Sequence, residues 1–173
     1  NVNRMVAAVY DMVKKERPDC TFGISPAGVA CTDANVAKNH GVNPMTGLTN
    51  ANDWQYDGIY SDPVQWLKTG TIDYISPQIY WPLNDAKAPF GTVTKWWNDV
   101  AKKFGRHHYA SHYNTSTTVM TPGDESTYQE LLNEVETNRS YNTNNTPGSI
   151  FYSARCLLLG DWGDTFRKYT ADN

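Results

Sequence analysis

The sequence has no long apolar run and no concentration of charge of one sign. Its 173 residues carry a formal net charge of -3, and no segment approaches the roughly 20 consecutive apolar residues that a membrane-spanning helix needs. The lack of a basic block argues against a surface for nucleic acid or for an anionic membrane. The residues from Asn1 to Arg4 do not resemble the start of a signal peptide, so we expect any targeting signal to precede Asn1.

Cysteine is also scarce. The three cysteines, Cys20, Cys31 and Cys156, are too few and too widely spaced for a disulfide framework. No C-x-x-C pair indicates zinc or redox chemistry. We therefore expect buried free thiols and no cofactor.

Aromatic residues are abundant by comparison. Six Trp and eleven Tyr stand beside only 19% charged residues. Many proteins that stack rings on sugars share this composition, although aromatic side chains also fill ordinary cores. Composition therefore permits carbohydrate binding without establishing it.

Five helices are expected, three of them from the spacing of an amphipathic face. Pro18 ends the first of them. Asp62 stands as an N-cap ahead of Pro63, and Gly70 follows where a left-handed C-cap belongs. The apolar stripes lie within residues 2–13, 93–104 and 128–135, these end signals predict a short helix at 63–69, and a final helix is expected near 164–170.

Four short runs between these helices are rich in β-forming residues. The expected strands cover residues 21–25, 72–80, 108–113 and 149–154. In the second strand Ile75 and Ile79 alternate with polar residues such as Ser76 and Gln78. No two strands are joined by a two-residue turn, so the order of strands and helices predicts an α/β fold with a parallel sheet.

The ends of these strands are the expected place for a site. Each strand ends in small or polar residues that lead into a loop, and α/β proteins place their sites at such ends. The loop after the first strand is long and rich in Gly, Asn and Thr, and it continues to about Tyr56. Long loops of this kind are usually functional.

Four stretches resemble one known family. They read GISP at 23–26, YDGIYSDP at 56–63, IDYISPQIYW at 72–81 and GSIFYSA at 148–154, and they extend in order over nearly the whole chain. This set is similar to the glycoside-hydrolase-like ten family. Members are described as (β/α)8 barrels of the bacterial envelope, some implicated in cleaving peptidoglycan glycan strands. The resemblance implies glycan hydrolysis driven by carboxylates, by a retaining or similar mechanism.

The resemblance also implies where the chain lies in such a barrel. It places residues 1–173 as a single partial domain, the C-terminal half of a TIM (β/α)8 barrel with four parallel strands, the fifth to eighth, and outer helices. The family's acidic motif, Phe-Asp-Asp-Tyr, is absent from the chain. Glycoside hydrolysis needs two carboxylates roughly 5 to 9.5 Å apart, and none of the four strand ends offers Asp or Glu. We expect the principal catalytic acids to lie outside this chain.

Four acidic residues near these strands need an interpretation. The N-cap position explains Asp62. Asp73 lies at the N-terminal end of its strand, where barrel residues usually serve stability. Asp57 and Asp85 lie on loops and remain candidates for assisting catalysis, although solvated loop acids are commoner.

Strand-end residues that are not acidic are predicted to contact the substrate, because amides and hydroxyls hydrogen-bond sugar hydroxyls and aromatic rings stack on sugar C–H faces. His107, His108 and His112 invite a metal interpretation, but their spacing offers no third ligand, so we expect a buried or sugar-facing histidine instead. The predicted substrate-binding residues are Ser25, Gln78, Tyr80, Trp81, His112, Tyr113, Ser153 and Arg155.

The leading hypothesis is therefore part of a periplasmic, cell-surface or secreted glycoside hydrolase. Its expected partners are a glycan and either the N-terminal half of the barrel or a second copy, because a half-barrel leaves strand edges and an inner face uncovered. The isolated chain is predicted to be inactive. One alternative is a non-catalytic carbohydrate-binding protein on a barrel-like scaffold, which neutral residues at the preceding strand ends would support. Another is a self-contained doubly wound domain, which needs helices on both sheet faces.

Overall fold

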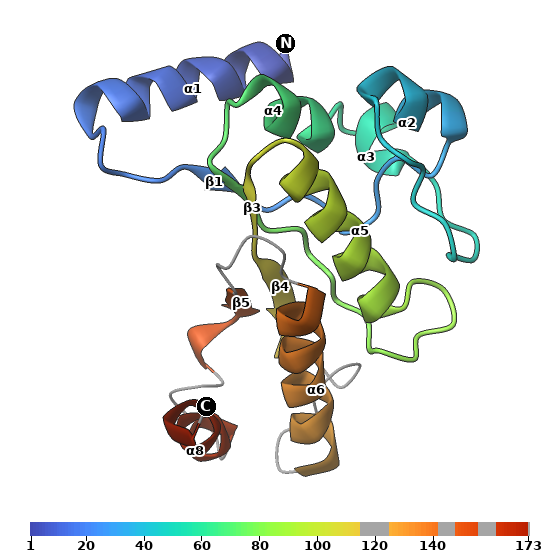
Figure 1. Ribbon diagram of the computed structural model, residues 1–173, viewed down its shortest axis with the longest axis vertical. Coiled ribbons are helices and arrows are strands. Elements are labelled where there is room, and N and C mark those ends of the chain that lie inside the picture. The colour runs from blue at the N-terminus through green and yellow to red at the C-terminus, as the bar shows by residue number, and fades with distance from the viewer. Residues whose placement is uncertain (115–124, 142–147, 156–161, 173) are drawn as a thin grey trace.

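The computed structural model describes residues 1–114, 125–141, 148–155 and 162–172 (Figure 1). The helices are α1 (Val2–Glu16), α2 (Ala34–His40), α3 (Trp54–Asp57), α4 (Pro63–Thr69), α5 (Phe90–Lys103), α6 (Glu125–Tyr141) and α8 (Trp162–Asp172). The strands are β1 (Gly23–Ile24), β2 (Tyr74–Ile75), β3 (His107–His108), β4 (Ala110–Tyr113) and β5 (Ser149–Tyr152). Within these described ranges, no helix combines the length and apolarity needed to cross a membrane.

Every strand pairing in the described chain is parallel. β1, β2 and β3 form one sheet, and β4 and β5 form a second. Gln78 links the two sheets, because it bridges to Ala27 on one side and to Ser111 on the other. The predicted α/β class with parallel strands is therefore confirmed.

Two predicted strands are less regular than expected. The run 72–80 pairs as a strand only at β2 and again at Gln78, and Pro77 between them has no N–H to donate to a ladder. The run 108–113 is divided into β3 and β4 around Tyr109. These strands nevertheless run through both sheets, so the side-chain alternation along them is preserved.

The helix ends follow the predicted signals. Asp62 accepts a hydrogen bond from the backbone N–H of Gln65 at 3.1 Å, and Gly70 has φ 73°. The sequence analysis missed α2 and α3, which lie within the long loop after β1. α2 does carry its own end signals, since Asp33 caps its N-terminus and Gly41 ends it with φ 74°.

The main core lies between the strands and helices α4 and α5. Ile75 and Ile79 are fully buried there, as their alternation predicts. Trp97 of α5 donates its indole N–H to the carbonyl of Gly28 at 2.7 Å, which fixes the chain just beyond β1. The largest buried side chains around them are Leu67, Ile72 and Phe90.

A buried polar contact joins β4 to α6. His112 Nδ1 lies 2.8 Å from Glu134 Oε2, and His112 Nε2 lies 3.0 Å from Ser149 Oγ. Burial lowers the pKa of His112 to about 3 and raises the pKa of Glu134 well above its usual range. We therefore describe the pair as neutral overall, with one proton shared between imidazole and carboxyl. The ring of His112 also stacks against Phe90 and Phe151, each at 5.1 Å.

His108 is a second buried histidine on the helix-covered side. It pairs with Ile75 in the sheet and is only 3% exposed. Neither ring nitrogen has a hydrogen-bond partner among the described residues. Burial, and secondarily the charge of His112, lowers the pKa of His108 to about 3, so this side chain is neutral at physiological pH.

Asp73 ties α1 to the start of the sheet. Its carboxylate accepts hydrogen bonds from the Tyr10 hydroxyl at 3.2 Å and the Phe22 N–H at 2.7 Å, and it lies 2.7 Å from Lys14 Nζ. Burial by itself raises the pKa of Asp73, but the hydrogen bonds from Lys14 and Phe22 outweigh burial and lower it. These contacts fit the structural role that the sequence predicts for Asp73.

Replacing Asp73 with Asn should lower the free energy of unfolding at pH 7 by roughly 1–3 kcal/mol, because charge-assisted hydrogen bonds are lost. The folded-state pKa of Asp73 is depressed, so its stabilising effect is present above the unfolded pKa near 4 and is lost as pH falls through the folded value. The difference between wild type and variant in denaturant titrations should therefore shrink in acid. Asp19→Asn is the control, because Asp19 is exposed and pairs only locally with Arg17. Equal stability of Asp73→Asn and wild type at pH 7 would contradict this role.

Acid should destabilise the fold through His108. Between pH 6.5 and about 3 the unfolded chain binds a proton at this histidine and the folded chain does not, so stability falls as pH is lowered. His108→Leu should reduce the slope of unfolding free energy against pH, by up to about 1.4 kcal/mol per pH unit. Urea titrations at several pH values measure this slope. Identical slopes for wild type and variant would show that His108 is protonated in the folded state.

Candidate functional site

Three tyrosines meet at the C-terminal ends of neighbouring strands. Gln78, Ser111 and Ile150 are in register, so the residues two positions further along each strand come together. The ring centroids of Tyr80 and Tyr113 are 4.9 Å apart, those of Tyr113 and Tyr152 are 5.9 Å apart, and those of Tyr80 and Tyr152 are 6.3 Å apart. The ring planes differ by only 19–25°, and we call Tyr80, Tyr113 and Tyr152 the tyrosine cluster.

The tyrosine cluster lies opposite the strand face that contacts α5 and α8, although Tyr113 also packs against Tyr128 and Leu131 of α6. Ile79, His112 and Phe151 alternate with its members and pack toward the helices, with Phe151 5.1 Å from Phe166 of α8. On the cluster side Tyr152 is 56% exposed and Ile150 is 39% exposed. The face that carries the cluster is therefore accessible in the described chain.

The phenol groups of the cluster can act as hydrogen-bond donors. Burial raises the pKa of Tyr80 above its usual value, against the opposing effect of a hydrogen bond with Ser111. A protonated phenol both donates and accepts, which suits a ligand that is rich in hydroxyl groups.

Two predicted binding residues stand next to the cluster. Gln78 is exposed, and its side-chain amide donates to the backbone carbonyl of Ser25 at 3.3 Å. Ser25 is itself exposed at the end of β1. The structure thus brings Ser25, Gln78, Tyr80 and Tyr113 to the same strand ends.

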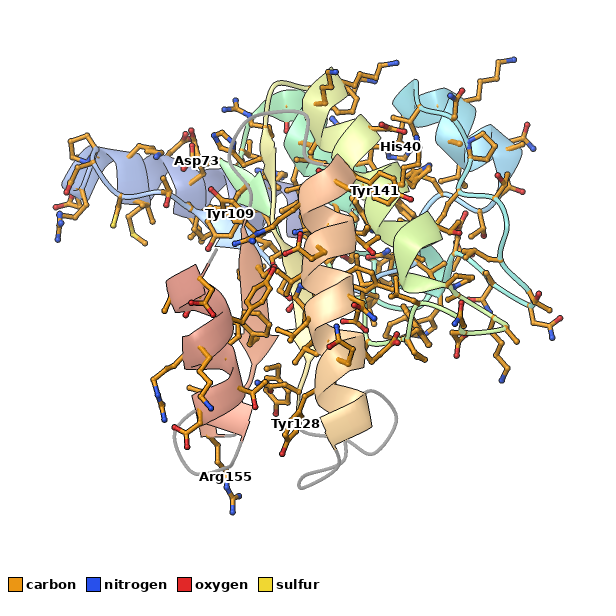
Figure 2. All side chains as sticks on the ribbon, turned by 60° about the horizontal axis from the view of Figure 1, so that its bottom comes forward. His40, Asp73, Tyr109, Tyr128, Tyr141 and Arg155 are labelled. Carbon is orange, nitrogen blue, oxygen red and sulfur yellow. The ribbon has the colours of Figure 1, made fainter. Side chains whose placement is uncertain are left out.

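Other predicted residues lie elsewhere. His112 is fully buried on the helix-covered face, with both ring nitrogens occupied, so we leave it out of the site. Ser153 is half-buried directly after β5, and Arg155 is exposed and extends away from the other labelled residues (Figure 2). The sequence analysis missed Tyr152. This residue pairs with Tyr113 across β4 and β5, so both side chains lie on the same face of the sheet.

A second concave region adjoins this strand end on the side of the long loop. It has a volume of about 300 Å³ and is lined in part by Trp54, Trp81 and Gln55. Trp81 was predicted from the strand-end pattern, whereas Trp54 was missed because it lies in a loop without periodicity. We call this region the tryptophan pocket.

The candidate acids have mainly local roles. Asp85 Oδ1 accepts hydrogen bonds from the backbone N–H groups of Lys87 and Ala88, both at 2.8 Å. Asp57 is exposed at the end of α3. Asp85 therefore shapes its loop, and Asp57 has the exposure of a solvated loop acid.

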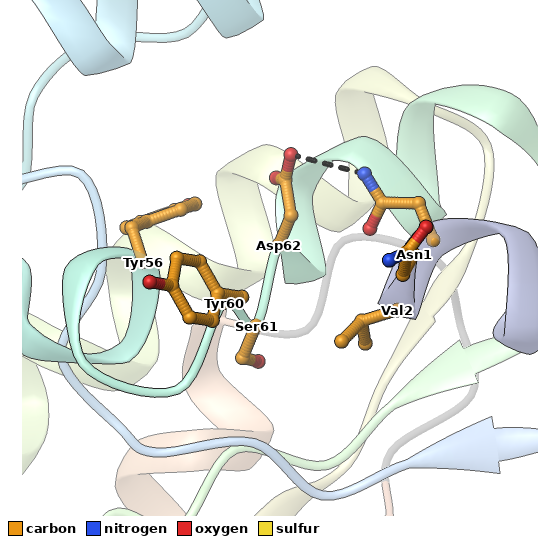
Figure 3. A pocket seen from close by; sticks show the side chains of 7 residues that line it. Asn1, Val2, Tyr56, Tyr60, Ser61 and Asp62 are labelled. Atoms are coloured by element: carbon orange, nitrogen blue, oxygen red, sulfur yellow. Dashed lines mark hydrogen bonds between the residues drawn. The ribbon is translucent and has the colours of Figure 1, made fainter.

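A larger pocket of about 470 Å³ lies where α1 meets α4 (Figure 3). Its one carboxylate, Asp62, is occupied by His40 Nε2 at 2.7 Å and by the Asn3 side-chain amide at 3.5 Å, besides its role as N-cap. Asn3 in turn accepts the indole N–H of Trp66 at 2.7 Å. These polar groups hold α1 and α2 on α4, so we interpret this pocket as structural.

The cysteines and histidines that the structure describes form no recognisable reactive centre. Across the described ranges, no three His, Cys, Asp or Glu side chains are placed to hold a metal ion. Cys31 is a buried free thiol, as predicted, and burial raises its pKa to about 11. Cys20 is exposed, so the prediction of burial is wrong there, because it lies in the turn between α1 and β1. Cys156 lies outside the described residues.

Comparison with known proteins identifies a family and several relatives of this chain. The family model described as "Glycosyl hydrolase-like 10" matches residues 1–124. Glycosyl hydrolase YngK of Bacillus subtilis is 30% identical over 159 residues, which are 91% of this chain and 29% of the relative. Glycosyl hydrolase DigH of Escherichia coli K12 is 36% identical over 102 residues, which are 59% of this chain and 21% of the relative.

The chain therefore spans between about a fifth and three-tenths of the length of these curated relatives. The matched region includes three of the four stretches that first suggested the family, at 23–26, 56–63 and 72–81. The chain belongs to the glycosyl hydrolase-like 10 family.

Proposed function

We propose that this chain supplies substrate-binding strand ends of a glycan-hydrolysing enzyme, and that it forms the C-terminal half of a (β/α)8 barrel. The tyrosine cluster is the observation that carries the proposal. The names of the relatives, both glycosyl hydrolases, support the reaction class. Because the relatives are bacterial, we take an envelope glycan such as the glycan strand of peptidoglycan as the substrate, and the cell envelope or exterior as the location.

The chemistry of the cluster fits a neutral, hydroxyl-rich ligand. Three phenol groups and the Gln78 amide stand together on an accessible face, and each can donate to or accept from a sugar hydroxyl. The open ring surface of Tyr152, which is 56% exposed, can also contact sugar C–H groups. Binding and orientation are the roles that this part of the site can perform.

The same strand ends supply no acid–base pair. None of the described residues at these ends is an acid, as Ser25, Gln78, Tyr80, Tyr113 and Ser153 illustrate. Hydrolysis of a glycosidic bond needs a general acid and a second carboxylate roughly 5 to 9.5 Å away. We therefore place the catalytic acids on preceding strands, outside residues 1–173.

The difference between the two strand faces supports the half-barrel proposal. Helices α5, α6 and α8 contact one face through Phe90, Glu134 and Phe166, while Gln78 and Tyr152 remain exposed on the other. An inner face that is open on one side needs the rest of the barrel, or a second copy, to cover it. A purely carbohydrate-binding protein becomes the better description if the preceding strand ends also lack acids.

Glycan affinity should depend on the tyrosine cluster. In the full-length protein, Tyr152→Ala should weaken binding to peptidoglycan glycan strands by roughly 1–3 kcal/mol, through loss of an aromatic contact surface. Tyr113→Phe should weaken binding by less, because it removes one hydroxyl and keeps the ring. Isothermal titration calorimetry measures both effects. Tyr60→Ala is the matched control, since Tyr60 is 74% exposed but lines the pocket at α1 and α4. Equal affinities in all three variants would reject the site.

Residues 1–173 alone should cleave no glycan, whereas the full-length protein should. The assay compares the release of reducing ends from peptidoglycan glycan strands at matched concentrations, with the mass in solution measured by light scattering. Asp57→Asn and Asp85→Asn in the full-length protein should retain most activity. Turnover by a monomeric preparation of the short chain would show that acids within it carry out the chemistry.

A further inference from the structure

The tryptophan pocket has features of a binding site that the proposed function does not use. We propose that it is a second saccharide site, and that it takes a sugar unit carrying a carboxylate group. The inference builds on the proposed glycan-binding role, but it does not depend on where or whether the glycan is cleaved. Four observations support it, and they concern the walls, the aromatic surface, one unsatisfied acceptor and the charge.

The two walls of the pocket are held rigidly together. One wall is the loop around residues 49–55, and the other is the segment 81–88 that follows the second strand. The backbone N–H of Thr49 donates to the carbonyl of Lys87 at 2.8 Å and connects the two. The pocket is therefore built into the fold and is not a chance gap between independent loops.

A glycine allows Trp81 to lie against the backbone beneath the pocket. A Cβ added at Gly28 would come within 2.8 Å of Trp81 Cζ3 and 2.5 Å of the Gln78 carbonyl oxygen. The carbonyl of Gly28 is fixed by the indole N–H of Trp97. The position of Trp81 thus follows from the close packing of the strand ends.

Trp54 provides a second aromatic surface that remains open to solvent. It is 56% exposed, although it is one of the largest apolar side chains in the chain. Its pyrrole edge lies against Gly58, where an added Cβ would come within 2.7 Å of Cδ1 and Nε1. An indole that is held in place and left open in a concave site is suited to contact the C–H face of a sugar ring.

Gln55 supplies an acceptor that lacks a donor. Its side chain is 1% exposed, and its amide nitrogen donates to the carbonyls of Val29 and Ala27. Because both carbonyls need a donor, the nitrogen must face them, and this fixes the orientation of the amide. Oε1 is then left with no hydrogen-bond partner among the described residues. Because Oε1 is closed off from solvent in the described chain, a ligand hydroxyl or a water would reach it only after a small shift of the pocket lining.

The charge of the pocket is positive. Lys87, which is exposed, is the one charged residue among the described residues that line it. The nearby carboxylate of Asp53 is occupied by Thr32 and by the N–H of Asp33, at 2.7–3.0 Å. Asp85 binds backbone N–H groups through Oδ1. A lysine as the one charged residue in the lining favours a carboxylated sugar over a neutral one.

Hexuronic acids carry a carboxylate group, and so do sugars with a carboxylate on an ether side chain. The test uses one matched pair of each kind with the full-length protein, glucuronic acid against glucose and N-acetylmuramic acid against N-acetylglucosamine. Ligand-observed NMR titration measures each affinity. At least one acid should bind about three- to tenfold more tightly than its neutral partner, and the pair that shows this identifies the source. Added salt should weaken binding of the acid alone.

Variants separate charge recognition from structural damage. Lys87→Met should abolish the preference for the acid and leave the affinity for the neutral sugar unchanged, while Lys87→Arg should retain the preference. Lys102→Met is the control, because Lys102 is exposed in the last turn of α5. Trp54→Ala should weaken acid and neutral sugar alike. Equal affinity for acid and neutral sugar in the wild type, or a preference that survives Lys87→Met, overturns the inference. Loss of binding after Tyr152→Ala tests the proposed function instead, so the two failures are distinguishable.

Discussion

The site depends on the backbone register at residues 77–79, where the two sheets are joined. The N–H of Gln78 donates to the carbonyl of Pro26, the N–H of Ile79 donates to Ser111, and the N–H of Ser111 donates to Pro77. Side chains alternate between faces with a period of two, so a slip of one residue would turn Tyr80 toward the helices and Ile79 toward the open face. The same hydrogen bonds that hold the strands together therefore determine which side chains meet the ligand.

The two faces of the strands differ in the side chains that they carry. The helix-covered face is closed by Ile79, Phe90 and Phe151, and it includes a buried histidine–glutamate pair that stays neutral overall. Burying His108 without a described partner has an energetic cost, which the surrounding apolar packing must exceed. The open face instead leaves phenols and an amide accessible. Stability thus resides on one face, and recognition becomes possible on the other.

Much of this arrangement could be predicted from local signals. The alternation of Ile75 and Ile79 with polar residues predicted which face of the strand is buried. It also predicted that Gln78 and Tyr80 lie on the opposite face. His112 was assigned to the ligand because it lies near a strand end, but its parity matches Ile79 and not Tyr80, which places it under α6. Trp54 and Gln55 could not be predicted, because their roles depend on how an aperiodic loop folds over Gly28 and the segment 81–88. Periodicity determines faces, whereas loop packing is a tertiary property.

Hydroxyl-radical footprinting of the full-length protein, with and without peptidoglycan glycan strands, tests the central claim most directly. The claim is that the register at Gln78 creates a ligand-binding face with the tyrosine cluster on it. Oxidation of Tyr152 should fall when glycan is added, because this ring is the most exposed of the three. Tyr60, which is 74% exposed at the other pocket, should be oxidised equally in both samples. Unchanged oxidation of Tyr152, together with protection of Tyr60, would contradict the account.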